Sequence, residues 1–388
     1  MTQMQSKNDM AIDQAAFAAL CADAARDAEA TEKARQLSPE LARRMANIGL
    51  FSMFVPKQIG GGEMTPPAGL EKIETLARHD AAAAWVVMIG STAALGAAYI
   101  APDIGADMFA AQDRITCGIF APNGMAVRHG DSYRVSGRWA WASGSANADY
   151  IGLGCVAKET DDPDERGTVR LLMVPRDALI FHDTWHTMGL CGTSSGDVEV
   201  RDIDVPVAHS YSIATDTPWP DTPLYNMPYF GFLATGVAAV ALGNARGALD
   251  EFIDLAGAKK GQGQKRTLAE KSAVQAGLAE AEAQWRAARA LFVTTIAEIW
   301  EDVQGGGAMT PEKRADLRLV STHAVRNCVN VVRAVHDLAG GTSVYRTSPI
   351  QRRLRDAETM TQHMITNADT LALVGRVMLG GWHAKMQL

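Results

Sequence analysis

The stretch GRWAWASGSANADY, residues 137–150, joins bulky aromatic residues to a run of very small ones. It begins like a β-strand that carries Trp139 and Trp141, and it continues through Ser143 into further small residues. On the alternating geometry of a strand, these three side chains would share one face, and Gly137 would leave that face open. Two indoles beside small hydroxyl residues indicate a surface that receives a flat, partly polar molecule.

The stretch lies in a segment with strand character. Between residues 115 and 205 the chain carries short runs rich in β-branched and aromatic residues, namely ITCGIFAP, SYRVSGRWAWAS, YIGLGCVA, TVRLLMVP and DVEVRDIDVP. Gly, Asp, Asn and Pro separate these runs at intervals typical of an antiparallel β-barrel or sandwich. We therefore predict a β domain over residues 113–220.

Helical patterns flank this β segment on both sides. Before it, Ser38 and Pro39 form a helix start, and a long apolar pattern from 67 to 98 is interrupted near Asp80. After PWPDTPLYNMPYF come three long amphipathic patterns, and a fourth helix is expected at about 355–380. The prediction is a mainly α protein with a central β domain. The predicted domains are an N-terminal helical domain at 1–112, the β domain at 113–220, and a C-terminal four-helix bundle at 221–388.

Composition excludes several classes of partner. The 388 residues carry a net charge of −7 without any Lys/Arg block, so nucleic acid is not expected as a partner. The five cysteines form no CxxC pair, which favours buried free thiols in a reducing cytoplasm over disulfides or a metal site. The polar start lacks the pattern of a signal peptide, and the uncharged run at 81–100 is too weakly apolar for a membrane span. We expect that run to be a buried helix and the protein to be cytoplasmic.

Three motifs in order resemble one known superfamily over nearly the whole chain. GRWAWASGSANADY resembles the flavin-contacting strand of the acyl-CoA dehydrogenase superfamily, with Trp141 on the family's tryptophan and Ser143 on its threonine. MGLCGTSSGDVEVRDIDVP and LAGGTSVYRTSPIQRRLRDA resemble two further family segments. The resemblance implies an acyl-CoA dehydrogenase-like fold and a flavin cofactor near the subunit interfaces of a homotetramer.

Within the superfamily, the chain is most similar to the flavin-dependent monooxygenases of two-component systems. FAPNGMAVRHGDSYRVSGRWAWASG and TSPIQRRLRDAETMTQH resemble segments of these enzymes. A dehydrogenase would instead need a carboxylate base beside the flavin. The family's usual glutamate position falls on Met364, and residues 222–249, where other members carry the base, contain no Asp or Glu. Glu358 matches neither position, and we expect it to have a surface role or an ion-pairing role.

The resemblance assigns the catalytic roles to two residues. Ser143 can donate a hydrogen bond to the N5 region of a flavin. His363 stands where the monooxygenases carry a histidine near flavin and substrate, and an imidazole can donate to bound oxygen or relay a proton near neutral pH. The phenol-hydroxylating relatives often carry a further histidine after a WV pair, and here that position is Ala93. A heteroaromatic ring that needs no deprotonation, such as an indole, is therefore favoured, and AAWVVMIGSTAAL resembles members that hydroxylate indole-acetate.

Further residues are predicted to line the site. The cofactor would contact Phe120, Pro122, Trp141, Ser143, Gly340 and Gly341, with the two glycines meeting the dinucleotide part of a flavin held by a neighbouring subunit. The substrate would contact Ser91, Thr92, Trp185, Thr193, Ser194, Tyr225 and Tyr229. No metal ligand is expected.

The leading hypothesis is an oxygenase component that hydroxylates an aromatic or heteroaromatic small molecule with O2. Because no GxGxxG fingerprint follows a strand, we expect a separate NAD(P)H-dependent reductase to supply the reduced flavin, FADH2 or FMNH2. The alternatives are a flavin dehydrogenase or oxidase acting on a thioester or a nitro compound, and an inactive scaffold that retains no flavin.

Overall fold

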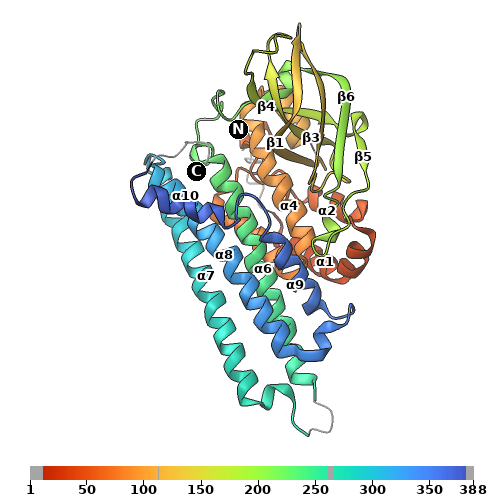
Figure 1. Ribbon diagram of the computed structural model, residues 1–388, viewed down its shortest axis with the longest axis vertical. Helices are drawn as coiled ribbons and strands as arrows, with labels where there is room; N and C mark the ends of the chain where they lie inside the picture. The colour runs from red at the N-terminus through yellow and green to blue at the C-terminus, as the bar shows by residue number, and fades with distance from the viewer. Residues whose placement is uncertain (1–11, 112, 261–264, 382–388) are drawn as a thin grey trace, which may run out of the picture.

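The computed structural model describes residues 12–111, 113–260 and 265–381. In this part of the chain, helices form both ends and strands form the middle (Figure 1), as predicted. The helices are α1 (Gln14–Ala34), α2 (Pro39–Asn47), α3 (Pro66–His79), α4 (Ala81–Ala93), α5 (Pro102–Gly105), α6 (Tyr229–Ala258), α7 (Ser272–Gln304), α8 (Pro311–Ala339), α9 (Pro349–Met360) and α10 (Asp369–Met378). The strands are β1 (Thr116–His129), β2 (Ser132–Trp139), β3 (Tyr150–Lys158), β4 (Thr168–Pro175), β5 (Ile180–His182), β6 (Asp197–Pro206) and β7 (Ser210–Tyr211).

Side-chain caps set the boundaries of the N-terminal helices. The Ser38 hydroxyl accepts the backbone N–H of Leu41 at the start of α2, with Pro39 in the first turn. Asp80 ends α3 and caps α4, where its carboxylate accepts the Ala83 N–H at 2.6 Å. The predicted interruption at Asp80 is confirmed, because this cap turns the chain between two helices.

The strands form one seven-stranded sheet in the order β5-β6-β2-β1-β3-β4-β7. The prediction of a purely antiparallel domain is wrong in one respect, since β1 and β3 pair in parallel. The pairing of β1 with β3 skips from Ile119 to Gly124, and the pairing with β2 begins at Gly124. Residues 120–123 therefore form an irregular segment that lies outside both ladders, the kind of bulge that often borders a binding site.

Trp139 and Trp141 do not share a face, contrary to the strand pattern. Trp139 is fully buried and its indole N–H donates to the Gly154 carbonyl at 2.7 Å. A Cβ on Gly137 would lie 2.6 Å from this indole, so the glycine makes room for Trp139 and not for a ligand. The strand ends at Trp139, and Trp141 takes a left-handed backbone with φ 66° that turns its half-exposed side chain outward.

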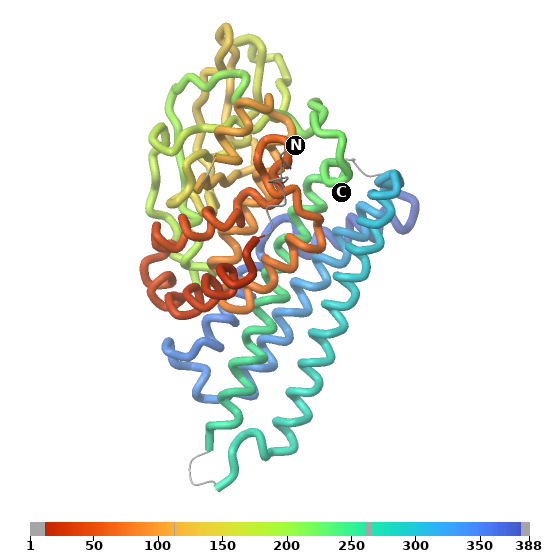
Figure 2. The backbone as a smooth tube through the Cα atoms, turned by 180° about the vertical axis from the view of Figure 1, so that it is seen from behind, coloured from red at the N-terminus to blue at the C-terminus, as the bar shows by residue number. Residues whose placement is uncertain are grey.

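Helices α6, α7 and α8 run side by side and extend away from the sheet, and the N-terminal helices lie between the sheet and this bundle (Figures 1 and 2). Gly243 of α6 lets α3 approach closely, because a Cβ there would lie 2.1 Å from the Glu74 carbonyl oxygen. By length and composition, Ala81–Tyr99 and Tyr229–Ala258 could each cross a membrane, but 94% of each apolar window is buried within the protein. Burial of the first segment confirms the expectation of a core helix.

The C-terminal segment differs from its prediction. Instead of one helix at 355–380, α9 ends at Met360 and α10 begins at Asp369. The hydroxyl of Thr361 donates to the Glu358 carbonyl, a local side-chain bond that competes with helix continuation. The consequence is that His363 lies in the connection between the two helices and not on a helical face.

Two residues of the RRLRDA motif tie the domains together. Arg353 is buried and donates to the carbonyls of Ala77, Arg78 and His79 at the C-terminal end of α3. The Asp356 carboxylate accepts the Leu190 backbone N–H at 2.6 Å. The motif thus positions both α3 and the loop before β6.

The cysteines agree with the prediction of free thiols. All five are unpaired, and four are buried, with Cys191 half-buried.

Candidate active site

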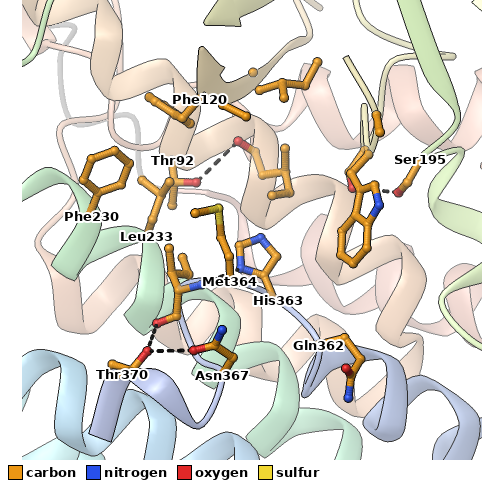
Figure 3. Close-up of a pocket in the computed structure, with 18 of the residues that line it drawn as sticks. Thr92, Phe120, Ser195, Phe230, Leu233, Gln362, His363, Met364, Asn367 and Thr370 are labelled. Atoms are coloured by element: carbon orange, nitrogen blue, oxygen red, sulfur yellow. Dashed lines mark hydrogen bonds between the residues drawn. The ribbon is translucent and has the colours of Figure 1, made fainter. Parts of the chain in front are cut away.

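A large cavity lies where the sheet, α4 and the C-terminal helices meet. Its volume is about 1160 Å³, larger than the several hundred Å³ typical of a site for one small ligand. The wall is formed by α4, the irregular 120–123 segment, β4, the start of α6, α8 and α10. The loops after β2, before β6 and after β7 and the α9–α10 connection complete it. In Figure 3, His363 and Met364 lie in the middle, with Phe230, Leu233, Thr92 and Phe120 to one side and Ser195 to the other.

Hydroxyl groups form a buried chain at one end of the cavity. Ser143 Oγ accepts the Trp85 indole N–H at 3.2 Å and lies 2.6 Å from Ser195 Oγ. Ser195 Oγ lies 2.6 Å from Thr193 Oγ1, which donates to the Leu190 carbonyl at 2.8 Å. We call Ser143, Ser195 and Thr193 the hydroxyl chain. It runs from the cavity wall into the protein.

Each hydroxyl of the chain has only one proton to donate. If Thr193 donates to the Leu190 carbonyl, Ser195 must donate to Thr193, and Ser143 must donate to Ser195. For Ser143 to donate into the cavity, the whole chain must reverse. Reversal leaves the Leu190 carbonyl paired, because the Trp185 indole N–H also donates to it at 3.0 Å. The chain can therefore adopt two orientations without leaving a buried carbonyl unpaired.

The backbone around the hydroxyl chain is unusual. Trp141, Leu190 and Ser194 have φ values of 66°, 49° and 53°, in the left-handed region that side chains rarely adopt. Backbone hydrogen bonds from Ala142 N to Gly196 O and from Gly144 N to Thr193 O tie the two loops together. Such conformations persist only where the surroundings fix them, and they concentrate at functional sites.

His363 is held in its neutral form. Burial, and secondarily the positive charge of Arg318, lowers the pKa of the imidazole to about 4. Its ring packs edge-on against the Trp85 ring, with centroids 5.5 Å apart. Because Trp85 also donates to Ser143, the two predicted catalytic residues meet on one indole although 220 positions separate them.

The structure brings together about half of the predicted site residues. Those that line the cavity are His363, Ser143, Trp141, Phe120, Pro122, Thr92 and Trp185. Thr193 is the member of the hydroxyl chain that does not line the cavity, and Ser194 lines a smaller neighbouring pocket of about 270 Å³.

The remaining predicted residues lie away from the cavity wall. Ser91 is buried and donates to the Met88 carbonyl within α4. Tyr225 donates to the Phe54 carbonyl and is buried in the hydrophobic core. Tyr229 donates to the carbonyls of Thr92 and Ala93, so it supports the lining ring of Phe120 from behind. Hydrogen bonding to nearby carbonyls turns these side chains inward.

Gly340 and Gly341 also lie outside the cavity of their own chain. They are exposed at the end of α8. Their contact with a flavin in another subunit stays a prediction.

Several cavity residues were not predicted from the sequence. Trp85 and Ser195 extend the interactions of Ser143, and Arg318 lines the wall from the interior of α8. The GTSS motif predicted the neighbouring hydroxyl residues Thr193 and Ser194 but not Ser195 itself. Arg318 lies in a long amphipathic pattern that gave no reason to predict it as a site residue. Its role depends on burial that only the tertiary structure shows.

The positions where a dehydrogenase would carry its catalytic carboxylate hold no Asp or Glu. Met364 lines the cavity with 71% of its surface exposed. Glu358 pairs with Arg333 at 2.6 Å, as predicted. Among the described residues that line the cavity, Asp369 is the one carboxylate, and it lies exposed on α10.

Comparison with known proteins agrees with this geometry. Residues 7–101 match the family "Acyl-CoA dehydrogenase, N-terminal domain" and residues 235–368 match "Acyl-CoA dehydrogenase, C-terminal domain". Indole-3-acetate monooxygenase of Pseudomonas putida is 32% identical over 350 residues, which cover 90% of this chain and 89% of that protein. The oxygenase component of the FADH(2)-dependent resorcinol hydroxylase of Rhizobium sp. is 30% identical, covering 91% and 90%. The crystal structure of the HsaA monooxygenase from M. tuberculosis matches with a TM-score of 0.87 and 23% identity, covering 98% of this chain and all of that one.

The fold and the two matched domains define an acyl-CoA dehydrogenase-like flavoprotein. Within that superfamily, the chain belongs to the flavin-dependent monooxygenases that act as oxygenase components of two-component systems. It is an oxidoreductase that uses reduced flavin and O2, and the predicted preference for monooxygenase over dehydrogenase is confirmed.

The cavity fits a flavin ring together with an aromatic substrate. The backbone of residues 120–123 lies outside the strand ladders, so it can offer hydrogen bonds to the polar edge of a ring. The Ser143 hydroxyl lies on the wall, and the Trp141 indole is half exposed beside it and packs edge-on against Trp185. This set of groups has the flat apolar surfaces and edge donors that an isoalloxazine ring requires.

Proposed function

We propose that this chain hydroxylates a neutral indole-type ring between Ser143 and His363, using reduced flavin from a separate reductase. The observation that carries the proposal is the cavity wall itself, where His363 packs on the Trp85 ring whose N–H bonds the hydroxyl chain, and where no buried carboxylate stands among the described lining residues. Proton abstraction from a thioester needs such a base, whereas oxygen transfer needs positioned hydrogen-bond donors and exclusion of water. The overall reaction consumes the ring C–H, O2 and reduced flavin and forms the ring C–OH, water and oxidised flavin.

Reduced flavin, when bound, supplies the electron pair that sends one oxygen atom to the ring and the other to water. Trp141, Phe120 and Pro122 would flank the ring system, and Ser143 would hold its N5 edge. Support comes from the position of all four residues on the cavity wall. The apolar surroundings strengthen these few polar contacts because water does not compete.

The hydroxyl chain suits both redox forms of the cofactor. In one orientation Ser143 donates to Ser195 and keeps a lone pair that can accept an N–H, which the reduced N5 carries. In the reversed orientation Ser143 donates, as the bare N5 of oxidised flavin requires. Only the second orientation forfeits the bond from Thr193 to the Leu190 carbonyl. We infer that the hydroxyl chain makes the protein bind reduced flavin more tightly than oxidised flavin, by about the free energy of one hydrogen bond.

His363 would act as a neutral donor beside the reacting centre. The backbone N–H of Ile365 points at its Nδ1 at 3.5 Å, which favours the tautomer with the proton on Nε2. That N–H can stabilise charge that develops on oxygen, or pass a proton on, without a permanent charge in the cavity.

An indole-type substrate agrees with the α4 wall. The Thr92 hydroxyl donates to the Met88 carbonyl at 2.7 Å, so its proton is already used, and Ala93 carries no base. A phenol would therefore find no group on α4 to deprotonate it. The relative from Pseudomonas putida is named for indole-3-acetate, which supports the same substrate class.

We further infer a homotetramer in the cytoplasm. Leu291 and Val293 of α7 and Ile253 of α6 are each at least 40% exposed, so the bundle offers apolar surface to another subunit. Val344 and Tyr345, next to Gly340 and Gly341, are also exposed. Light scattering should give four times the chain mass of 41.5 kDa, and a monomer would overturn this part of the proposal.

The test is the coupling of oxygen use to hydroxylation. The protein is mixed with indole-3-acetate, FMN or FAD, and a flavin reductase, and product, O2 and hydrogen peroxide are measured together. Ser143→Ala should release most of the oxygen as peroxide, whereas Ser321→Ala, which removes a buried hydroxyl of α8 outside the cavity, should couple like the wild type. Equal coupling in wild type and Ser143→Ala would exclude the role given to Ser143.

A further inference from the structure

A buried arginine that has no carboxylate partner among the described residues lies on the cavity wall. Arg318 of α8 is only 6% exposed, yet its Nε has no hydrogen-bond partner. In the part of the chain that the structure describes, its one hydrogen bond runs from Nη1 to the Phe230 carbonyl at 3.5 Å, the outer limit of such a bond. No ion pair joins it to a carboxylate within residues 12–111, 113–260 and 265–381. A guanidinium has five N–H donors, so most of its capacity is unused.

The contrast with Arg353 shows how unusual this is. Arg353 is as deeply buried, at 4% exposed, but it pairs with Glu251 at 2.9 Å and donates to three backbone carbonyls. Buried charges in proteins are generally paired, because removal from water is costly otherwise. Burial lowers the pKa of Arg318 to about 10, which still leaves it charged at neutral pH. Arg318 is therefore a buried positive charge in the site with no carboxylate partner among the described residues.

The other charged groups of the cavity do not neutralise Arg318. Asp369 and Arg376 lie exposed on α10, and His363 is neutral. Next to Arg318 on the same face of α8, the buried hydroxyl of Thr322 also has no partner. On α8, Arg318 is thus the polar group that reaches the cavity wall, next to the apolar side chains of Phe230 and Leu233.

We propose that Arg318 binds the carboxylate of the substrate, which makes the substrate an aromatic acid with its ring toward His363. The inference rests on the proposed function for the ring chemistry and adds the recognition of the acid group. The guanidinium fork matches a carboxylate with two parallel hydrogen bonds, and few other anions of this size pair so well in an apolar wall. A neutral ring of the same shape would leave the charge unpaired, so the arginine selects for the acid.

Binding measurements on the flavin-free protein test this proposal without using turnover. Indole-3-acetate and the isosteric neutral indole-3-acetamide are titrated calorimetrically into wild type, Arg318→Met and Arg326→Met. Arg326 is exposed on the same helix and does not line the cavity, so it is the matched control. We expect wild type and Arg326→Met to prefer the acetate, and Arg318→Met to lose about 10- to 100-fold in acetate affinity with little change for the amide.

The same titrations distinguish failure of this proposal from failure of the proposed function. Equal affinity of wild type for acid and amide, or unchanged acetate affinity in Arg318→Met, would overturn the role of Arg318. Weaker binding of FMN or FAD to Arg318→Met with unchanged acetate binding would also overturn it, because the arginine would then serve a flavin phosphate. A wild type that binds the acetate through Arg318 but forms no hydroxylated product would contradict the proposed function alone. In Arg318→Met, the pKa of His363, followed by NMR, should rise as the neighbouring charge is removed.

Discussion

Replacement of Thr193 by Val tests the hydroxyl chain at a position that never touches the cavity. Thr193 is fully buried and does not line the wall, and Val has nearly the same shape. In the wild type, Ser143 can donate to oxidised flavin only if the bond from Thr193 to the Leu190 carbonyl is given up. In Thr193→Val that bond is already absent, and Ser195 can donate to Ser143 at no further cost.

The magnitude follows from one hydrogen bond. Binding of reduced flavin adds one bond in both proteins, whereas binding of oxidised flavin adds a net bond only in the variant. One neutral hydrogen bond contributes about 1 kcal/mol, so Thr193→Val should bind oxidised flavin about fivefold more tightly and reduced flavin equally well. Loss of the two bonds that Thr193 makes should also lower the free energy of unfolding by about 1–3 kcal/mol.

The assay is a pair of flavin titrations followed by fluorescence, one in air and one under anaerobic reduction, with urea unfolding of the same samples. The control is Thr235→Val, which removes an equally buried hydroxyl whose 2.6 Å bond to the Phe232 carbonyl lies outside the cavity. The control should lose stability without any change in the ratio of the two dissociation constants. An unchanged ratio in Thr193→Val, or weaker binding of both redox forms, would refute the reasoning.

Substitutions at His363, Asp356 and Gly243 test oxygen transfer, the pH dependence of stability and the packing of α3 against α6. His363→Gln should retain flavin but release most of the consumed oxygen as hydrogen peroxide, measured against product formed, and unchanged coupling would remove His363 from the mechanism. Burial raises the pKa of the Asp356 carboxyl to about 6, so the folded state holds this proton more tightly than the unfolded chain. The free energy of unfolding should therefore fall by up to ~3 kcal/mol as pH rises from about 4 to about 6. Asp356→Asn, whose amide oxygen can still accept the Leu190 N–H, should flatten that pH dependence in denaturant titrations, and a parallel slope in the variant would show that another group causes it. In thermal unfolding, Gly243→Ala should destabilise the protein by about 2 kcal/mol or more, because α3 occupies the space that its Cβ would need. Gly257→Ala on the same helix, where a Cβ would meet nothing within 4 Å, should stabilise the protein by up to ~1 kcal/mol. Equal effects of the two substitutions would contradict the close approach of α3 to α6 at Gly243.

The sequence predicted most of the secondary structure because local rules governed it. Ser38 and Pro39 start a helix, Asp80 interrupts one, and alternation along β2 holds as far as Trp139. The errors came where tertiary contacts override the pattern. The parallel pairing of β1 with β3 depends on the order of the strands in space, which no local pattern encodes.

The site residues were also predicted only in part, because some of them depend on local motifs and others on tertiary contacts. Trp141 and Phe120 line the cavity, as predicted from motifs around Ser143 that keep a fixed position relative to the sheet. Tyr225 was expected on the wall because aromatic residues suit an aromatic ligand, but its hydroxyl is bound to the Phe54 carbonyl in the core. Arg318 could not be found, since an arginine in an amphipathic helix is ordinarily exposed. Only its burial without a partner marks it.

Isotopic labelling in a single turnover tests the central claim most directly. The protein, loaded anaerobically with reduced flavin and indole-3-acetate, is mixed with ¹⁸O₂, and the organic product is analysed by mass spectrometry. The account predicts a hydroxylated indole acid that carries one ¹⁸O atom, in near-equal amount to the O2 consumed. Recovery of the unchanged acid with all oxygen as labelled hydrogen peroxide, or a product oxygen derived from water, would contradict it.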